Sequence, residues 1–367
     1  MRILHIGKYW PMSGGMETVI FDIVSHFSNK GVRCDLLAVA TDGGVDMDLN
    51  ENCHIMCVPE LIKVSSASLA PAMISRLRKI VASYDVVHIH CPNPMGNVAL
   101  LLSGFKGEVI VHWHSDIIKQ KFLLTFYRPL QNWLIKRAKF ILGTSQRYLD
   151  NSTDLIGMQN KVLTMPLGVE QIKPSMDGVV GVRDAYAGKK IILTVGRLVP
   201  YKGHKYLIEA ATHLGPEYVV LIAGNGPLKQ QLEKLIEGLN LQERVHLLGN
   251  VTNEFLHDLY GACDVFCLSS IWKTEAFGLV QIEAMSCGKP VVATDIEGSG
   301  VPWVNKNGYS GINVEPENPK ALADAIKSIL SDSETYKMYS ENARQRYKEL
   351  FTKEKMLERC EEIYNML

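Results

Sequence analysis

The sequence predicts an α/β protein made of two doubly wound domains, each with a parallel β-sheet. Short apolar, β-branched runs alternate with helical stretches along the chain, a pattern typical of parallel sheets covered by helices. The alternation stops near residues 168–190 and then starts again. A length of 367 residues suits about two domains.

The first half opens with an apolar run over 2–7 and a Pro/Ser/Gly loop. A helix is expected over 16–31, because apolar residues at 19, 20, 23, 24 and 27 have helical spacing and Gly31 follows them. Strands are expected over 34–40, 84–92 and 108–115. Each is apolar, ends in polar or Pro/Gly residues and precedes a helical stretch.

The second half begins after an aperiodic stretch, residues 168–190, that contains Pro174 and four glycines and is interpreted as a linker. Strands are expected over 189–198, 218–226, 244–249, 262–270 and 289–295, followed by helices from Pro319 onward. The predicted domains are residues 1–170 and 171–350, and residues 351–367 form a C-terminal helix.

Charge and composition exclude several classes of protein. The 39 basic and 39 acidic residues give a net charge of zero, which argues against a nucleic-acid-binding protein. Residues 1–150 carry 16 basic and 12 acidic residues, or plus 4, so a local basic face remains compatible with this balance. Apolar runs of membrane-spanning or signal-peptide length are absent, and a cytosolic protein is expected.

Metal binding is not expected. The eight cysteines lack CxxC spacing and are interpreted as reduced core thiols. Asp46-Met-Asp48 is a DxD motif, a pattern that can hold a divalent ion, but it lies in a polar stretch and is interpreted as a solvated loop. We therefore expect activity without a metal or other cofactor.

The loops after the strands of the second half carry the candidate site, since ligands of such sheets bind beyond the carboxyl ends of the strands. Glu275 lies in one loop and Glu283 in the helix that follows, with the first amides of that helix, at Gly278, Leu279 and Val280, available to an anion. The alternative is a cap and a solvated helix residue.

Two further loops are candidates. Arg197 and Lys202 follow the strand over 189–198 and suit a diphosphate, although loop cations are common by chance. Gly224 and Gly226 follow the next strand, but they form no complete dinucleotide-binding fingerprint.

Together these loops resemble the donor half of the retaining GT-B glycosyltransferases of family 4, the group 1 transferases. The most specific match is Glu275-Ala-Phe277-Gly278-Leu279-Val280 with Glu283 and Gly288-Lys-Pro-Val-Val. The resemblance implies that Arg197 and Lys202 bind the donor diphosphate, that Glu275 contacts the donor sugar and that Glu283 holds the ribose. It also implies phosphate contacts from the 278–280 amides and packing of the Gly249-Asn-Val251 turn on the base.

The first half matches this family more loosely. Gly14-Gly15 resembles its glycine loop, where backbone approaches the donor phosphate, and the alternative is a plain turn before a helix. His114 resembles the histidine near the transferred sugar, and Asp116 is a second candidate with a helix cap as its alternative role. We expect the rings of His112 and His114 to point to opposite faces of their strand, with His114 in the site.

The resemblance implies retaining transfer of a sugar from a nucleotide diphosphate donor to a hydroxyl, with the leaving diphosphate taking the acceptor proton. Arg197, Lys202 and the helix amides would stabilise charge on that diphosphate. A UDP-linked hexose or N-acetylhexosamine is the first choice of donor and GDP-mannose the second. A non-hydrolysing nucleotide-sugar epimerase, a nicotinamide oxidoreductase and a non-catalytic nucleotide-sugar-binding protein are the alternatives.

Residues 117–147 contain seven basic residues and no acidic ones, interleaved with aromatic residues. This composition suits a peripheral contact with the inner face of an anionic membrane, and a lipid-linked saccharide acceptor in surface polysaccharide or glycolipid assembly. The alternative is that the aromatics belong to the core and the cations to a solvated face. The basic residues are Lys119, Lys121, Arg128, Lys136, Arg137, Lys139 and Arg147.

Overall fold

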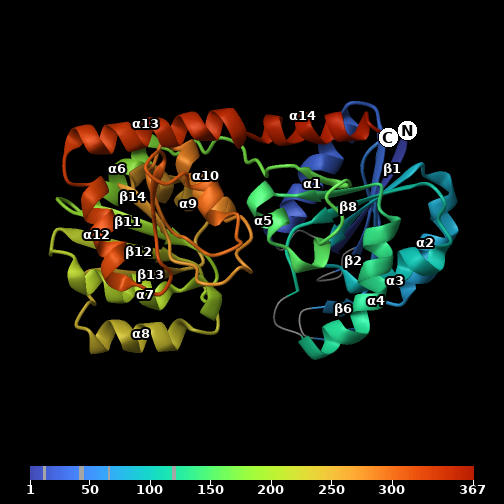
Figure 1. Ribbon diagram of the computed structural model, residues 1–367. Coiled ribbons are helices and arrows are strands. Elements are labelled where there is room, and N and C mark those ends of the chain that lie inside the picture. Colours follow the sequence, from blue (N-terminus) through green and yellow to red (C-terminus); the bar gives the residue numbers. More distant parts are fainter. Residues whose placement is uncertain (11–13, 41–44, 65–66, 118–120) are drawn as a thin grey trace. The chain divides into compact units, whose positions relative to one another are not determined.

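The computed structural model describes residues 1–10, 14–40, 45–64, 67–117 and 121–367 (Figure 1). The chain divides into two compact units. Unit 1 contains Met1–Met165 and Leu357–Leu367, and unit 2 contains Pro166–Met356. Both units have the predicted α/β architecture with a parallel sheet, so the predicted fold class is confirmed.

Unit 1 contains an eight-stranded sheet in the order β10-β9-β8-β7-β1-β2-β4-β3. The pairs are parallel except β3 with β4, and β5 and β6 form a separate antiparallel pair. The strands are β1 (Arg2–Trp10), β2 (Arg33–Ala40), β3 (Met47–Asn50), β4 (Cys53–Pro59), β5 (Ile62–Val64), β6 (Ala67–Leu69), β7 (Val86–Cys91), β8 (Glu108–Trp113), β9 (Phe140–Gly143) and β10 (Val162–Thr164).

The helices of unit 1 follow the strands as the sequence predicts. Every residue of β7 is buried, as expected of an inner parallel strand with both faces covered. In α1 the buried apolar residues have the helical spacing noted above. The helices are α1 (Gly15–Asn29), α2 (Ala72–Ile80), α3 (Pro94–Ser103), α4 (Lys121–Arg137), α5 (Gln146–Asp150) and the later part of α14 (Lys353–Tyr364).

Unit 2 contains a six-stranded sheet in the order β13-β12-β11-β14-β15-β16, and all of its pairs are parallel. The strands are β11 (Lys190–Val195), β12 (Tyr218–Ala223), β13 (Val245–Gly249), β14 (Val265–Leu268), β15 (Val291–Thr294) and β16 (Gly311–Val314). The helices are α6 (Met176–Ala185), α7 (His204–Ala210), α8 (Lys229–Gly238), α9 (Asn253–Ala262), α10 (Leu279–Ser286), α11 (Val301–Val304), α12 (Pro319–Ile329) and α13 (Ser333–Leu350).

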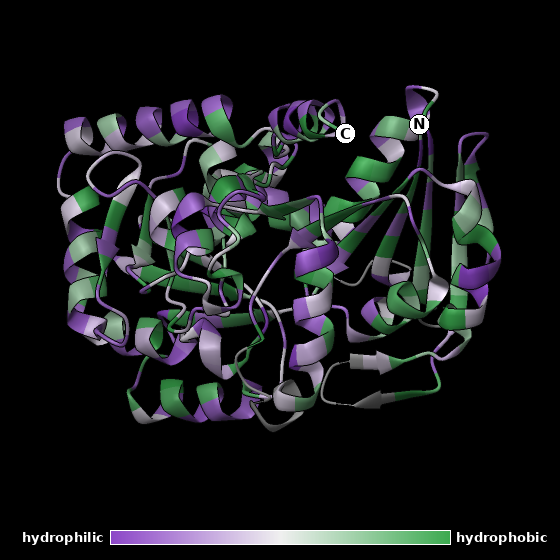
Figure 2. Ribbon diagram, turned by 45° about the vertical axis from the view of Figure 1, so that its right-hand side comes forward, coloured by the Kyte–Doolittle hydropathy of each residue, from purple (hydrophilic) through white to green (hydrophobic). Residues whose placement is uncertain are grey.

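The core of unit 2 lies between its sheet and the helices on its faces. Buried residues of α7 and α12 pack with the strands in one hydrophobic cluster, and α13 contacts α10. Strands are mainly hydrophobic, whereas α13 exposes much hydrophilic surface (Figure 2).

Two interpretations of the sequence are correct only in part. The stretch 168–190 contains helix α6, which packs on α9 and is capped by Ser175, so it is not an irregular linker throughout. The DxD motif lies only partly in a loop: Asp46 precedes strand β3 (Met47–Asn50), whereas Asp48 lies within it, paired with β4. The sequence analysis also missed the short strands β3, β5, β6, β9, β10 and β16 and the longer strand β4.

The strand orders place a switch point in each sheet. In unit 2 the chain moves outward from β11 through β12 on one side and from β14 through β15 on the other. In unit 1 the corresponding boundary lies between β1 and β7. Loops diverge at such a boundary and leave room for a ligand.

Candidate functional site

The loops after β11 and β14 meet at the switch point of unit 2. Lys202 ends a short 3₁₀ turn after β11, and Glu275 follows β14. The Lys202 ammonium lies 2.6 Å from a Glu275 carboxylate oxygen, and each side chain is 11% exposed. The structure thus brings together two residues that are 73 positions apart in the sequence, 275 minus 202.

Glycines allow these loops to approach each other. Gly203 has a φ of 65°, and a Cβ there would lie 2.0 Å from the carbonyl oxygen of Ser269. Gly224 has a φ of 141°, and a Cβ there would lie 2.0 Å from the Gly196 carbonyl oxygen. A side chain at either position would push the backbones apart, so the close packing of these loops requires glycine.

The ion pair neutralises two poorly hydrated charges. Burial by itself would lower the pKa of Lys202, but Glu275, Tyr201 and Glu283 outweigh it and the pKa is raised. The Ser270 hydroxyl donates a 2.9 Å hydrogen bond to the same oxygen of Glu275. Lys202 is therefore held as a cation beside two carboxylates, and an incoming anion would compete with Glu275 for it.

Glu283 lies on α10 and accepts a 2.6 Å hydrogen bond from the Tyr260 hydroxyl. Burial raises the pKa of Glu283, while Tyr260, His257 and Lys202 act in the opposite direction. Glu283 is thus a partly buried, hydrogen-bonded carboxylate, unlike a solvated helix residue.

Helix α10 begins beside this pair of carboxylates. Gly278 is its N-cap with a φ of 77°, and the amides of Leu279 and Val280 lie in its first turn, where no partner exists within the helix. Phe277 belongs to the motif that resembles the family's donor half, which predicts a donor-binding residue, but its side chain is buried against Trp303 and Phe351. Phe277 can therefore offer a ligand only its backbone.

The other predicted residues of unit 2 lie on neighbouring loops. The Arg197 side chain is exposed and has no ion-pair partner among the described residues, while its carbonyl accepts from His204. Gly224 bonds to Gly249 across the loops after β12 and β13, and Gly226 packs against Leu198. Val251 lies half-buried in the turn after β13.

This arrangement can bind an anion and hydroxyl groups. Two cations and a helix N-terminus favour phosphate oxygens, because both supply N–H donors and positive potential. Two carboxylates next to them accept hydrogen bonds from hydroxyls, as in a sugar or a ribose. A cavity of about 540 Å³ elsewhere in unit 2, between α7 and α8, contains none of the predicted site residues.

In unit 1, Gly15 begins α1 and is exposed, whereas His114 follows β8 and is 9% exposed. The expectation that His112 and His114 point to opposite faces is wrong. Residues two apart on a strand face the same side, and these rings stack with centroids 4.1 Å apart. Asp116 accepts hydrogen bonds from the Trp113 indole and the Ser152 hydroxyl, so its side chain braces this loop.

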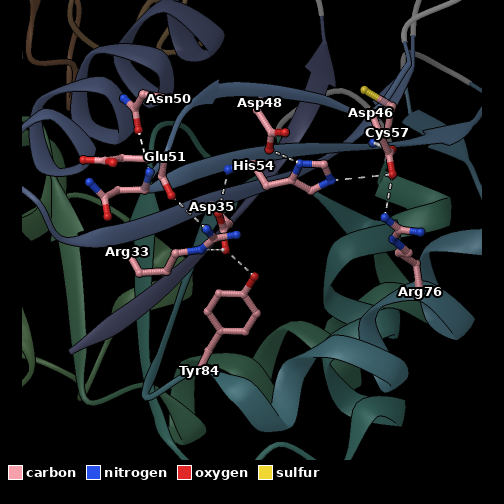
Figure 3. A network of polar contacts seen from close by, with 11 residues as sticks. Arg33, Asp35, Asp46, Asp48, Asn50, Glu51, His54, Cys57, Arg76 and Tyr84 are labelled. Atoms are coloured by element: carbon pink, nitrogen blue, oxygen red, sulfur yellow. Dashed lines mark hydrogen bonds and ion pairs between the residues drawn. The ribbon is translucent and has the colours of Figure 1, made fainter.

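The DxD carboxylates are engaged with basic side chains (Figure 3). Asp46 pairs with Arg76 at 2.5 Å and lies 3.8 Å from the His54 ring, and Asp48 lies 2.7 Å from the other ring nitrogen. Asp46 also accepts a hydrogen bond from the Cys57 amide. These contacts brace β3 and β4, although both carboxylates stay exposed to solvent, Asp48 to 78%.

Two histidine sets could offer metal ligands, His5/His88/His90 and His90/His112/His114, whose ligand atoms lie within 4.8 Å of one another in each set. The eight cysteines are free thiols. Several of the histidine nitrogens already bond to one another. The sequence analysis named His112 and His114 but overlooked His5, His88 and His90, although the alternation in HIHC was visible, and it also missed Ser270 and Tyr260.

The basic segment contains α4. Arg128, Lys136 and Lys139 are exposed, as is 73% of Phe126, whereas Trp133 is half-buried. Lys119 and the side chain of Lys121 lie outside the described residues. Among the helices that the structure describes, none is both long and apolar enough to span a bilayer.

Both halves of the chain match models of sugar-transferring enzymes. Residues 182–346 match glycosyl transferases group 1, and residues 13–171 match glycosyltransferase family 4. The fold is similar to that of Anabaena Alr3699/HepE in complex with UDP and glucose, with a TM-score of 0.82, 22% identity and full coverage of both chains. Two Rossmann-like units with this likeness define a GT-B glycosyltransferase.

Full-length relatives identify the family. The chain is 30% identical to the D-rhamnosyltransferase WbpZ of Pseudomonas aeruginosa, covering 96% of this chain and 92% of the relative. It is 28% identical to the O-antigen chain mannosyltransferase C of Escherichia coli, covering 100% and 99%. The chain belongs to glycosyltransferase family 4, and it is a sugar-transferring enzyme.

Proposed function

We propose that this enzyme transfers a hexosyl group, with retention, from a nucleoside diphosphate hexose to a hydroxyl of a saccharide in surface polysaccharide assembly. The observation that carries the proposal is the buried Lys202–Glu275 pair at the switch point, next to Glu283 and the start of α10. Cations and amides suit the diphosphate and carboxylates suit the hydroxyls of a sugar and a ribose.

The roles follow from this chemistry. Arg197, Lys202 and the first amides of α10 would hold the diphosphate and stabilise the charge that grows on it as the glycosidic bond breaks. Glu275 would bind the sugar and Glu283 the ribose. In unit 1, His114 would contact the sugar and Gly15 would let backbone approach phosphate. The departing diphosphate would take the proton of the acceptor hydroxyl, since the carboxylates of Glu275 and Glu283 would serve in binding the donor.

The names of two full-length relatives favour a sugar of manno configuration, because one transfers mannose and the other D-rhamnose, which is 6-deoxymannose. UDP remains our first choice of nucleotide from the sequence, and GDP is the second. The acceptor would be a growing saccharide, lipid-linked if the basic segment around α4 contacts a membrane.

The test combines binding with turnover. Thermal shift with UDP, GDP, ADP and TDP should show one nucleotide that raises the melting temperature, and Arg197→Ala and Glu283→Ala should abolish the shift. Hydrolysis or transfer assays with the UDP- and GDP-linked hexoses of that nucleotide then identify the sugar, and activity should persist in EDTA. Identical responses from the parent and both variants would refute the assignment of the donor site.

A further inference from the structure

Five buried imidazoles gather on one face of the unit 1 sheet. His5 lies on β1, His88 and His90 on β7, and His112 on β8, with His114 directly after it. His5, His88, His90 and His112 are 0% exposed, and His114 is 9% exposed. Burial lowers the pKa of His5 and His114 to about 3, so both rings are neutral at pH 7.

Four of these rings and one tyrosine form a continuous hydrogen-bonded chain within unit 1. His114 Nε2 lies 3.0 Å from His90 Nδ1, and His90 Nε2 lies 3.0 Å from His5 Nδ1. His5 Nε2 lies 3.1 Å from the hydroxyl of Tyr364, on α14. The same hydroxyl lies 2.7 Å from His88 Nδ1. The chain therefore connects a fully buried end, at His88, with the more exposed ring of His114.

A chain of neutral imidazoles has a direction. Each ring has one N–H and one bare nitrogen, so the choice at one link determines the tautomer of each ring after it. Either every proton points from His114 toward Tyr364, or every proton points the other way. His88 Nε2 has no partner among the described residues in either case, so that atom does not decide the direction.

The hydroxyl of Tyr364 indicates the direction. Hydrogen bonds from O–H donors are usually shorter than those from N–H donors. The 2.7 Å contact fits donation from the hydroxyl to His88, and the 3.1 Å contact fits donation from His5 Nε2–H to the hydroxyl oxygen. The hydroxyl has a third partner, the Cys360 thiol, which then donates to the hydroxyl oxygen because the single O–H is directed at His88. With that direction, His90 donates to His5 and His114 donates to His90.

We propose that this chain fixes His114 as the tautomer with its proton on Nε2, leaving Nδ1 as a hydrogen-bond acceptor for a hydroxyl of the sugar substrate. The role of Nδ1 as an acceptor for a sugar hydroxyl rests on the proposed function, whereas the assignment of the tautomer does not. His90, His5 and Tyr364 are positioning residues, since they act through His114. An unprotonated ring nitrogen accepts a hydrogen bond from a hydroxyl. It cannot hydrogen-bond to an unprotonated phosphate oxygen, because both atoms are acceptors.

The plane of the His114 ring is also restrained. His112 stacks on it with an interplanar angle of 14°, and the His114 amide donates to the Cys91 carbonyl. Tautomer and orientation are thus both set by residues buried in the sheet. This differs from a histidine on a loop, whose tautomer solvent can exchange freely.

The test is nitrogen NMR of the full chain with ring-labelled histidine, recorded without donor. The chain has 11 histidines, and His114→Gln assigns the relevant signals. The parent should show His114 neutral and protonated on Nε2. A signal from the Nδ1–H form or from imidazolium would overturn the proposal, as would a change on EDTA treatment, which would indicate a metal on these rings.

Two variants test the coupling. Tyr364→Phe leaves His5 Nε2–H without an acceptor, and His88→Leu frees the hydroxyl to donate to His5, so each should move His114 toward the Nδ1–H form. Tyr347→Phe is the control, because it removes another buried hydroxyl, bonded to the Val169 carbonyl outside the chain. Unchanged His114 signals in both folded test variants would overturn the coupling. Signals that behave as expected but ignore added donor would instead count against the proposed function.

Discussion

Replacing Lys202 by methionine separates the two roles of the buried ion pair. The change roughly keeps the length of the side chain. It leaves the Glu275 carboxylate with the Ser270 hydroxyl as its remaining side-chain donor among the described residues, in a site where each member of the pair is 11% exposed. Breaking a buried pair from one side costs about 3 to 5 kcal/mol, and the residual exposure points to the lower end. About 3 kcal/mol corresponds to roughly 6 to 12 °C in melting temperature for a domain of this size.

The double variant Lys202→Met/Glu275→Gln should regain most of this stability, since no unpaired charge remains, with a coupling of about 2 kcal/mol. Activity should not recover. Loss of one electrostatic donor costs about 2 to 4 kcal/mol in transition-state stabilisation, or roughly 30- to 900-fold in kcat/KM. Calorimetric melting and donor turnover measure the two effects on the same samples.

Arg197→Met is the matched control, because Arg197 is exposed and has no ion-pair partner among the described residues. It should lose activity to a similar extent and keep the parental melting temperature. The reasoning is refuted if Lys202→Met melts within about 2 °C of the parent, or if the double variant is as unstable as the single one.

Three further predictions concern other parts of the chain. Burial raises the pKa of Glu283 above its unfolded value near 4.5, so ionisation of this carboxyl destabilises the folded state as the pH rises. The melting temperature of Glu283→Gln should equal that of the parent near pH 4 and exceed it by a growing margin toward pH 7. A difference that does not change with pH would contradict this. Gly224→Ala should destabilise unit 2 by about 2 kcal/mol or more in calorimetry, whereas Gly238→Ala, with open space around its Cβ, should be neutral or stabilising by up to about 1 kcal/mol. Binding to anionic liposomes should fall at least several-fold when Arg128, Lys136 and Lys139 are replaced by Glu. The same replacement of three exposed lysines of unit 2, Lys320, Lys337 and Lys348, should leave binding unchanged. Equal effects of the two triple variants would argue against a membrane face on α4.

The α/β class, just over half of the strands and the candidate residues of the loops after β11 and β14 could be predicted from the sequence. Strand periodicity is a local property, and the motif from Glu275 to Glu283 is contiguous, so neither requires knowledge of the fold. Strand β16 was missed because its sequence, Gly-Ile-Asn-Val, contains no continuous apolar run, unlike the equally short β14 and β15.

Which of these residues contact one another depends on the fold. Lys202 and Glu275 form a pair because β11 and β14 are neighbours in the sheet, and Phe277 turns inward because Trp303 and Phe351 are there to cover it. The DxD carboxylates are solvated, as expected, but they are also paired with Arg76 and His54. The histidine chain depends on the register of β1, β7 and β8 and on Tyr364, more than 350 positions from His5. Such contacts are set by strand order and helix docking, which spacing along one chain does not encode.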